Sequence, residues 1–182
     1  MNFIERQDNL LTRKECMNAI EWVSKNKELN LDENKETHTG YNYYNLMSID
    51  EDPQQCFSPE PLRPLLRAIN SLKNSYIKNF PEVSRIHAWD LQYIRLKHWQ
   101  PGYYYSAWHS EQGVGFYSNR VLSFLLYLSD NNSYTEFRRY RKVQTKAGRG
   151  ILFPSHFTHE HRGSICKNGL DRYVLSGYYC FT

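Results

Sequence analysis

Short apolar or alternating runs separated by turns fill the second half of the chain, and this pattern limits the fold more than any other feature. No helical pattern interrupts them between residue 89 and the end. Strands that follow one another without crossover helices favour a β-sandwich or a barrel over a parallel sheet. The sequence therefore predicts a mainly β core, with strands in segments that include WDLQYIRLKHW, YYYSAWH, RVLSFLLYLS, KVQTKAG, GILFP, THEHRG and DRYVLSGYYCF.

Two amphipathic helices are predicted in the first half of the chain. Apolar residues recur at helical spacing over 11–27, where Thr12 is a candidate N-cap and Glu15 its capping-box partner. A second apolar face runs over 59–80. The polar stretch 28–58 between them is predicted as a long loop with room for one short strand. We expect the two helices to cover one face of the β core.

Length and composition are typical of an ordinary globular protein. The 182 residues predict a single domain over 1–182, with a helical support region at 1–88 and the β core at 89–182. A net charge of +4 is too small to indicate nucleic-acid binding by itself. The four cysteines are widely spaced and are predicted to be reduced thiols. Without an apolar leader or a membrane-length apolar run, we expect a cytoplasmic protein that contacts no membrane.

A candidate metal site begins with His109 and Glu111, at the end of the segment expected to be the strand YYYSAWH. Residues two apart on a strand point to the same side, so the imidazole and the carboxylate can meet at one ion. Two histidines and one carboxylate occupy one face of an octahedral metal and leave three positions open. Non-haem Fe(II) oxygenases use this arrangement.

The third ligand is sought in the segment FPSHFTHEHRG, which contains His156, His159 and His161. His159 and His161 would share a face if this segment were a strand. Arg172 follows eleven residues after His161, in another predicted strand. A guanidinium there could bind the far carboxylate of a 2-oxo acid in a bidentate manner.

Taken together, these pieces resemble the 2-oxoglutarate/Fe(II)-dependent dioxygenases, and among them the prolyl 4-hydroxylase-like branch. The resemblance covers about residues 90–181. It implies a double-stranded β-helix, the cupin-like jelly roll, preceded by the two helices. It rests on five segments in the family's order: QYIRLKHWQPGYYYSAWHSE, NRVLSFLLYLSDN, TEF, AGRGILFPSHFTHEHRG and GLDRYVLSGYY.

The resemblance implies that His109, Glu111 and His161 bind iron. His161 is preferred to the other two histidines because His-Arg-Gly has the family's His-x-Gly form at the right distance from Arg172. The chain has Glu111 where the family more often has Asp, so an additional methylene separates the carboxylate from its backbone. His159 is a candidate for a supporting position beside the metal, and His156 is expected in a turn.

The cosubstrate residues also follow from the resemblance. Arg172 matches the basic residue that binds the C5 carboxylate of 2-oxoglutarate. Tyr105 matches a tyrosine that often hydrogen-bonds the cosubstrate. Ser123 lies where a Ser or Thr of the long core strand often faces it.

The implied activity is hydroxylation of a C–H bond, most simply of a peptidyl prolyl residue or a free amino acid. Fe(II) would be the cofactor, and 2-oxoglutarate and O₂ would be consumed with release of succinate and CO₂. Ascorbate could restore oxidised iron. One alternative is a non-enzymatic cupin-like module in which His159 and His161 hold a metal. Another is a nucleic-acid oxygenase, which is disfavoured because no second Arg follows Arg172 by about six residues. The sequence does not identify the substrate or the oligomeric state.

Overall fold

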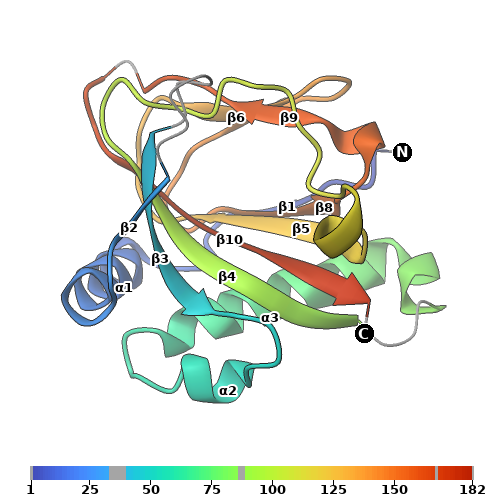
Figure 1. Ribbon diagram of the computed structural model, residues 1–182, viewed down its shortest axis with the longest axis horizontal. Coiled ribbons are helices and arrows are strands. Elements are labelled where there is room, and N and C mark those ends of the chain that lie inside the picture. The colour runs from blue at the N-terminus through green and yellow to red at the C-terminus, as the bar shows by residue number, and fades with distance from the viewer. Residues whose placement is uncertain (1, 33–39, 86–88, 167, 182) are drawn as a thin grey trace.

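The computed structural model describes residues 2–32, 40–85, 89–166 and 168–181. Strands predominate and most of the helical residues belong to the first half of the chain (Figure 1). The helices are α1 (Arg13–Asn26), α2 (Pro53–Cys56) and α3 (Arg63–Asn79), with short 3₁₀ helices η1 (Pro81–Arg85), η2 (Gly115–Tyr117) and η3 (Phe157–His159). The strands are β1 (Glu5–Gln7), β2 (Asn30–Asp32), β3 (Tyr41–Met47), β4 (Trp89–Trp99), β5 (Arg120–Tyr127), β6 (Tyr134–Phe137), β7 (Lys142–Gln144), β8 (Gly150–Pro154), β9 (His161–Gly163) and β10 (Arg172–Phe181).

Two antiparallel sheets face each other, as the prediction of a jelly-roll core requires. The major sheet has seven strands in the order β1-β8-β5-β10-β4-β3-β2. The minor sheet has three, in the order β7-β6-β9, and lies opposite the major sheet in Figure 1. Several neighbours in this order, such as β1 with β8 and β4 with β10, are far apart in sequence, which is typical of a jelly roll. The predicted mainly β fold with flanking helices is confirmed.

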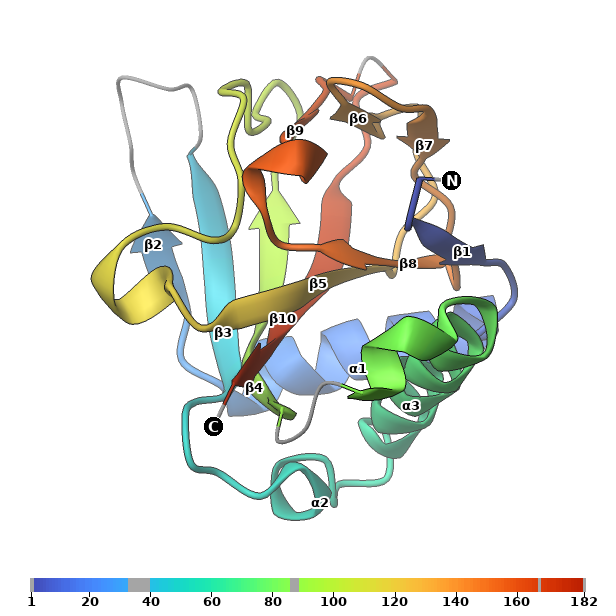
Figure 2. The same ribbon diagram turned by 90° about the vertical axis from the view of Figure 1, so that its right-hand side faces the viewer.

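Both long helices cover the outer face of the major sheet (Figure 2). A large apolar cluster fills this layer, with Leu65, Ile69 and Leu72 of α3 beside Leu96 and Phe124 of the sheet. Burying such side chains contributes about 1.5–3 kcal/mol each to folding. The helices are therefore fixed to the sheet on the side away from the space between the two sheets.

The boundaries of the two helices follow local sequence signals. Thr12 caps α1, and its side chain and that of Glu15 form the predicted capping box. The second helix starts at Arg63 and not at residue 59. Pro64 lies in its first turn, where a missing N–H costs nothing because no helical carbonyl precedes it.

Residues 28–58 contain more structure than the predicted loop. They contribute β2, the seven-residue β3 and the short helix α2, while residues 33–39 lie outside the described part of the chain. β3 pairs with β4 and so extends the major sheet. Its sequence YNYYNLM is rich in tyrosine and asparagine, so the simple alternation of apolar and polar residues is missing. This explains why the periodicity predicted no more than one short strand in this stretch.

A second apolar cluster has members on both sheets and fills part of the space between them. It includes Tyr127, Phe137, Phe153 and Val174. The remaining space holds the candidate site. Within the described residues, none of the helices combines the length and the apolar character needed to cross a bilayer.

Candidate metal centre

The segment that carries His109 and Glu111 is a loop and not the predicted strand. His109 belongs to an isolated β-bridge with His161, in which each backbone N–H donates to the other's carbonyl at 3.1 and 2.9 Å. The backbone N–H of Glu111 donates to the carbonyl of Ser155 at 3.1 Å. The two side chains therefore converge because backbone contacts with residues 155 and 161 hold the loop, and not because of strand alternation.

Three donor atoms meet at one point between the sheets. The Nε2 atoms of His109 and His161 each lie 3.5 Å from Oε1 of Glu111. All three donor atoms lie within 4.8 Å of one another. A metal about 2.1 Å from each ligand would separate ligands at right angles by about 3 Å. The arrangement is thus close to the size of one face of a metal's coordination shell.

Backbone carbonyls orient both imidazoles. Nδ1 of His109 lies 3.1 Å from the carbonyl oxygen of Ala107, and Nδ1 of His161 lies 3.1 Å from that of His159. A carbonyl only accepts, so each Nδ1 must carry the proton. Each Nε2 then presents its lone pair to the shared point, which is the form in which imidazole binds a metal.

The ionisation states also suit a metal. Burial opposes the charge on Glu111, but the nearby His109 and His161 rings outweigh it and hold the pKa of this carboxyl well below its ordinary value. Burial lowers the pKa of His161, which favours the neutral ring. One carboxylate and neutral imidazoles are the donor set preferred by a non-haem Fe(II) site.

Next to the donor atoms lies a narrow pocket of about 50 Å³ that ends at Arg172. Arg172 is 5% exposed, and its Nη2 donates to Oγ1 of Thr135 at 3.1 Å. Its Nε has no hydrogen-bond partner, and neither has Nε1 of neighbouring Trp99. Burial of the guanidinium lowers its pKa, and no ion pair with a carboxylate is found for it within the described residues. A buried cation with an unsatisfied hydrogen-bond donor lowers the stability of the fold unless the anionic group of a ligand binds it.

Of the two other predicted cosubstrate residues, one lies in this pocket and one does not. Tyr105 lines the pocket, and its ring centroid is 4.2 Å from that of His109. Ser123 is buried, but its hydroxyl is hydrogen-bonded to that of Ser155 at 2.7 Å and is not part of the pocket wall. Because the carbonyl of Ser155 accepts from the backbone N–H of Glu111, Ser123 contacts a residue that holds the metal-site loop.

His159 does not share a face with His161, contrary to the strand prediction. It lies in η3, where its Nε2 is 2.8 Å from the carbonyl oxygen of Asn2 and its ring stacks on Tyr140. Burial lowers its pKa. Its imidazole is fully engaged away from the donor atoms, so the His159–His161 metal pair of the cupin-like alternative does not form. His159 supports the site through its carbonyl, which accepts from Nδ1 of His161.

Several pocket residues were not predicted. Lys97 lines the pocket from β4, where alternation along the strand places it on the same face as Trp99. Thr135 belongs to the segment TEF, which contributed to the family resemblance without a role being assigned. Tyr178 and Arg120 contact Glu111 from other strands, at sequence distances that no local pattern predicts.

Comparison with known proteins agrees with this geometry. Residues 91–180 match the family described as the 2OG-Fe(II) oxygenase superfamily. No curated protein sequence matches the chain.

Solved structures share the fold over nearly the whole chain. A viral collagen prolyl hydroxylase from Paramecium bursaria Chlorella virus-1, in complex with 2OG, has a TM-score of 0.67 at 14% identity, covering 100% of this chain and 97% of that one. A prolyl-4-hydroxylase of Pseudomonas putida has a TM-score of 0.66 at 17% identity, covering 100% and 94%. A prolyl hydroxylase of Trichoplax adhaerens, in complex with a hypoxia inducible factor peptide fragment, has a TM-score of 0.69 at 15% identity, covering 99% and 84%.

The predicted resemblance is therefore confirmed. By the match of residues 91–180 and by a fold shared with prolyl hydroxylases, this chain is a member of the 2OG-Fe(II) oxygenase superfamily, whose enzymes use Fe(II) and 2-oxoglutarate.

Proposed function

We propose that His109, Glu111 and His161 bind Fe(II) and that the pocket ending at Arg172 binds 2-oxoglutarate. The enzyme would hydroxylate a C–H bond of a peptidyl prolyl residue or a free amino acid, with release of succinate and CO₂. The observation that carries this proposal is the continuity of the site. Three converging donor atoms open onto a pocket whose far end is a buried guanidinium with an unused donor.

Iron and 2-oxoglutarate, when bound, supply an oxidising power that no side chain offers. The chain's own residues bind and orient. Arg172 would hold the far carboxylate of the cosubstrate, assisted by Thr135, whose Oγ1 also accepts from the hydroxyl of Tyr127 at 2.7 Å. Tyr105 forms a wall between this pocket and the solvent side.

Gly163 gives the His-x-Gly motif a physical reason. A Cβ at this position would lie 3.0 Å from Nη1 of Arg172 and 3.3 Å from the backbone nitrogen of Tyr105. A side chain there would therefore make tight contacts and push β9, the Tyr105 segment and the guanidinium apart by a few tenths of an ångström. The motif therefore serves the cosubstrate pocket as well as the metal ligand.

The test is an anaerobic titration of the purified protein with Fe(II) and then with 2-oxoglutarate. We expect an absorption band that requires both, and succinate release when O₂ is admitted. His109→Ala and His161→Ala should abolish the band. Arg172→Leu should weaken 2-oxoglutarate binding about tenfold or more, because a charge-assisted bidentate contact is lost.

His156→Ala is the matched control, since His156 is an exposed histidine five residues before His161. It should leave the band unchanged. A band that persists at full strength in both His109→Ala and His161→Ala would contradict the assignment of the metal site.

A further inference from the structure

The metal site opens on a second space, wider than the cosubstrate pocket. This outer cleft has a volume of about 370 Å³ and shares Lys97, Tyr105, His109 and Glu111 with the inner pocket. A substrate that reaches the iron from solvent must therefore occupy the outer cleft.

Positive charge dominates the wall of the outer cleft. Arg95, Lys97 and Arg120 line it, and among the described lining residues Glu111 is the only carboxylate. Arg95 and Lys97 are two residues apart on β4 and so lie on the same face of the sheet, turned toward the site.

This charge exceeds what iron and the cosubstrate require. In the ligand set proposed above, the two positive charges of Fe(II) and the charge of Arg172 cancel the two carboxylates of 2-oxoglutarate and that of Glu111. Arg120 is partly engaged by Glu111, whose Oε2 lies 3.4 Å from its Nη1. Lys97 also interacts with Glu111, whose pKa it helps to lower. Arg95 has no ion pair with a carboxylate among the described residues, so its charge faces the site, where charge interactions are stronger than in water.

Contacts with β3 fix the guanidinium of Arg95 in the outer cleft. Its Nε donates to Oδ1 of Asn45 on β3 at 3.1 Å, and its guanidinium lies 4.6 Å from the ring centroid of Tyr43. Its two terminal nitrogens have no hydrogen-bond partner among the described residues. A guanidinium fixed in this way can bind an oxyanion with two parallel hydrogen bonds.

Aromatic side chains form the outer lip of the cleft. Phe116 is 57% exposed and packs edge-on against Tyr93, with ring centroids 4.9 Å apart. Tyr117 beside it is 49% exposed. These rings offer an apolar surface on which the hydrocarbon part of a substrate can pack.

We propose that the substrate of this enzyme carries a free oxyanion, a carboxylate or a phosphate, that Arg95 and Lys97 bind in the outer cleft. The inference rests on the proposed function and narrows it. A free amino acid, or a C-terminal residue with its own carboxylate, satisfies these cations, whereas an internal prolyl residue of a neutral peptide does not.

The experiment compares matched compounds that differ only in the anion. The carboxylate pairs are L-proline against L-prolinamide, and N-acetyl-Ala-Pro against its C-terminal amide. The phosphate pair is O-phospho-L-serine amide against L-serine amide. Succinate release is measured with Fe(II), 2-oxoglutarate and O₂ present, and compared with release when no compound is added. We expect the anionic member of at least one pair to stimulate release more than its neutral partner, and the responding pair identifies the anion.

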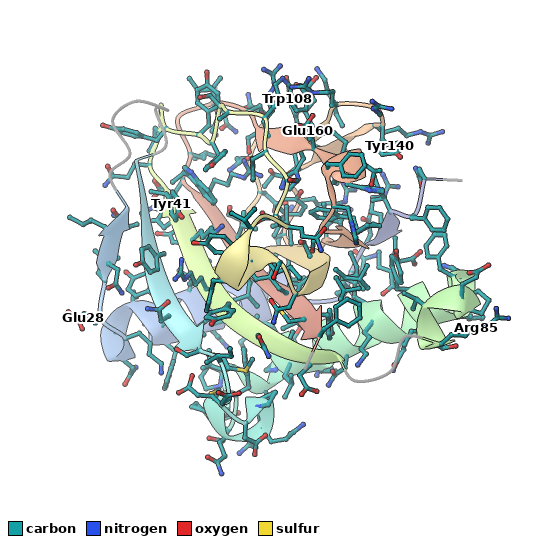
Figure 3. The ribbon with its side chains drawn as sticks, turned by 45° about the vertical axis from the view of Figure 1, so that its right-hand side comes forward. Glu28, Tyr41, Arg85, Trp108, Tyr140 and Glu160 are labelled. Carbon is teal, nitrogen blue, oxygen red and sulfur yellow. The ribbon has the colours of Figure 1, made fainter. Side chains whose placement is uncertain are left out.

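The variant Arg95→Gln should raise KM for the stimulating anion about tenfold or more, because a charge-assisted contact is removed, and should reduce the preference over the neutral partner. Arg95→Lys should restore much of that preference. The matched control is Arg85→Gln, which removes the same charge from an exposed residue of η1, distant from Tyr41 of the cleft in Figure 3.

Equal succinate release from the two members of every pair, including no release from either, would overturn the proposal. If the absorption band that requires Fe(II) and 2-oxoglutarate is still present, the proposed function stands. A preference for anions that Arg95→Gln does not change would overturn the role of Arg95. Loss of the band itself in the unmodified protein would contradict the proposed function.

Discussion

At the scale of single residues, the structure explains how a glutamate serves where the family more often has an aspartate. Oε2 of Glu111 accepts from the hydroxyl of Tyr178 at 2.8 Å and lies 3.4 Å from Nη1 of Arg120. The guanidinium of Arg120 lies 3.6 Å from the ring centroid of Tyr178, so these two side chains support each other. Oε1 is left facing the two imidazoles. The additional methylene of Glu111 is thus fixed by contacts from two strands.

Removing the hydroxyl that holds Glu111 should weaken the metal site. We expect Tyr178→Phe to lower the affinity for Fe(II) about tenfold, because residues that orient metal ligands typically contribute this much. An anaerobic Fe(II) titration followed by absorption in the presence of 2-oxoglutarate measures it.

Tyr76→Phe is a suitable comparison for that variant. The hydroxyl of Tyr76 donates to the carbonyl of Phe3 at 3.2 Å, away from the site. It should alter stability and leave Fe(II) affinity unchanged. Equal Fe(II) affinity in Tyr178→Phe and the unmodified protein would show that Glu111 needs no help from Tyr178.

At the scale of elements, local sequence signals determine the start of α1, whereas tertiary contacts determine the conformation of the loop that carries His109. The capping box of α1 forms because Thr12 and Glu15 are three residues apart: Thr12 accepts from the N–H of Glu15 at 3.2 Å, and Glu15 accepts from the N–H of Thr12 at 2.8 Å. The loop that carries His109 has no such internal pattern. Its conformation depends on hydrogen bonds to residues 155 and 161, on other elements.

Breaking the capping box should destabilise the protein without affecting the site. We expect Thr12→Ala to lower the free energy of unfolding by about 1 kcal/mol, which corresponds to about 2–4 °C in Tm. Thermal unfolding followed by circular dichroism measures it.

Ser24→Ala, on the same helix, provides the control because the hydroxyl of Ser24 bonds only the carbonyl of Glu21 nearby. Its effect should stay within about 0.5 kcal/mol. If the two alanine variants were equally stable, the cap would contribute nothing to the fold.

At the scale of the whole molecule, an ion pair joins the N-terminal segment to the residue that precedes β8. Both oxygens of Asp8 are bonded by Arg149, Oδ1 to Nε at 2.6 Å and Oδ2 to Nη2 at 2.9 Å. The hydrogen bond from Arg149 holds the pKa of Asp8 below its ordinary value of 3.8. The pair fixes the N-terminal segment beside β8, which also pairs with β1.

This pair predicts a pH-dependent difference in stability. Asp8→Asn should lower the free energy of unfolding by about 1–2 kcal/mol at pH 7, a value reduced for the partial exposure of the pair. Because the pKa of Asp8 is lower in the folded state, the contribution is complete above pH 3.8 and is lost as the pH falls through the folded-state pKa. The difference in Tm between the two proteins should therefore be constant near neutrality and shrink below pH 3.8.

Glu21→Gln is the matched control, since Glu21 pairs with Lys25 four residues along the exposed face of α1. The difference in Tm between Glu21→Gln and the unmodified protein should be small at every pH. A difference in Tm between the unmodified protein and Asp8→Asn that grew on acidification would contradict the assigned direction.

The sequence by itself determined the features that depend on short-range pattern: the strand-rich second half and the cap of α1. It also identified His109, Glu111, His161 and Arg172 as candidate site residues from their types and their spacing. Helix and strand periodicities act over a few residues, so such features can be predicted from the chain alone. Over 28–58 the sequence predicts only a loop with room for one short strand, because the tyrosines and asparagines of β3 lack alternation.

Only the tertiary structure decided which groups meet. It brought His159 into hydrogen-bonding contact with the carbonyl of Asn2, Ser123 with Ser155, and Tyr178 with Glu111. It also aligned Arg95 and Lys97 with the mouth of the site. The physical reason is that antiparallel pairing brings together strands separated by up to a hundred residues or more, and no local periodicity carries information about that register.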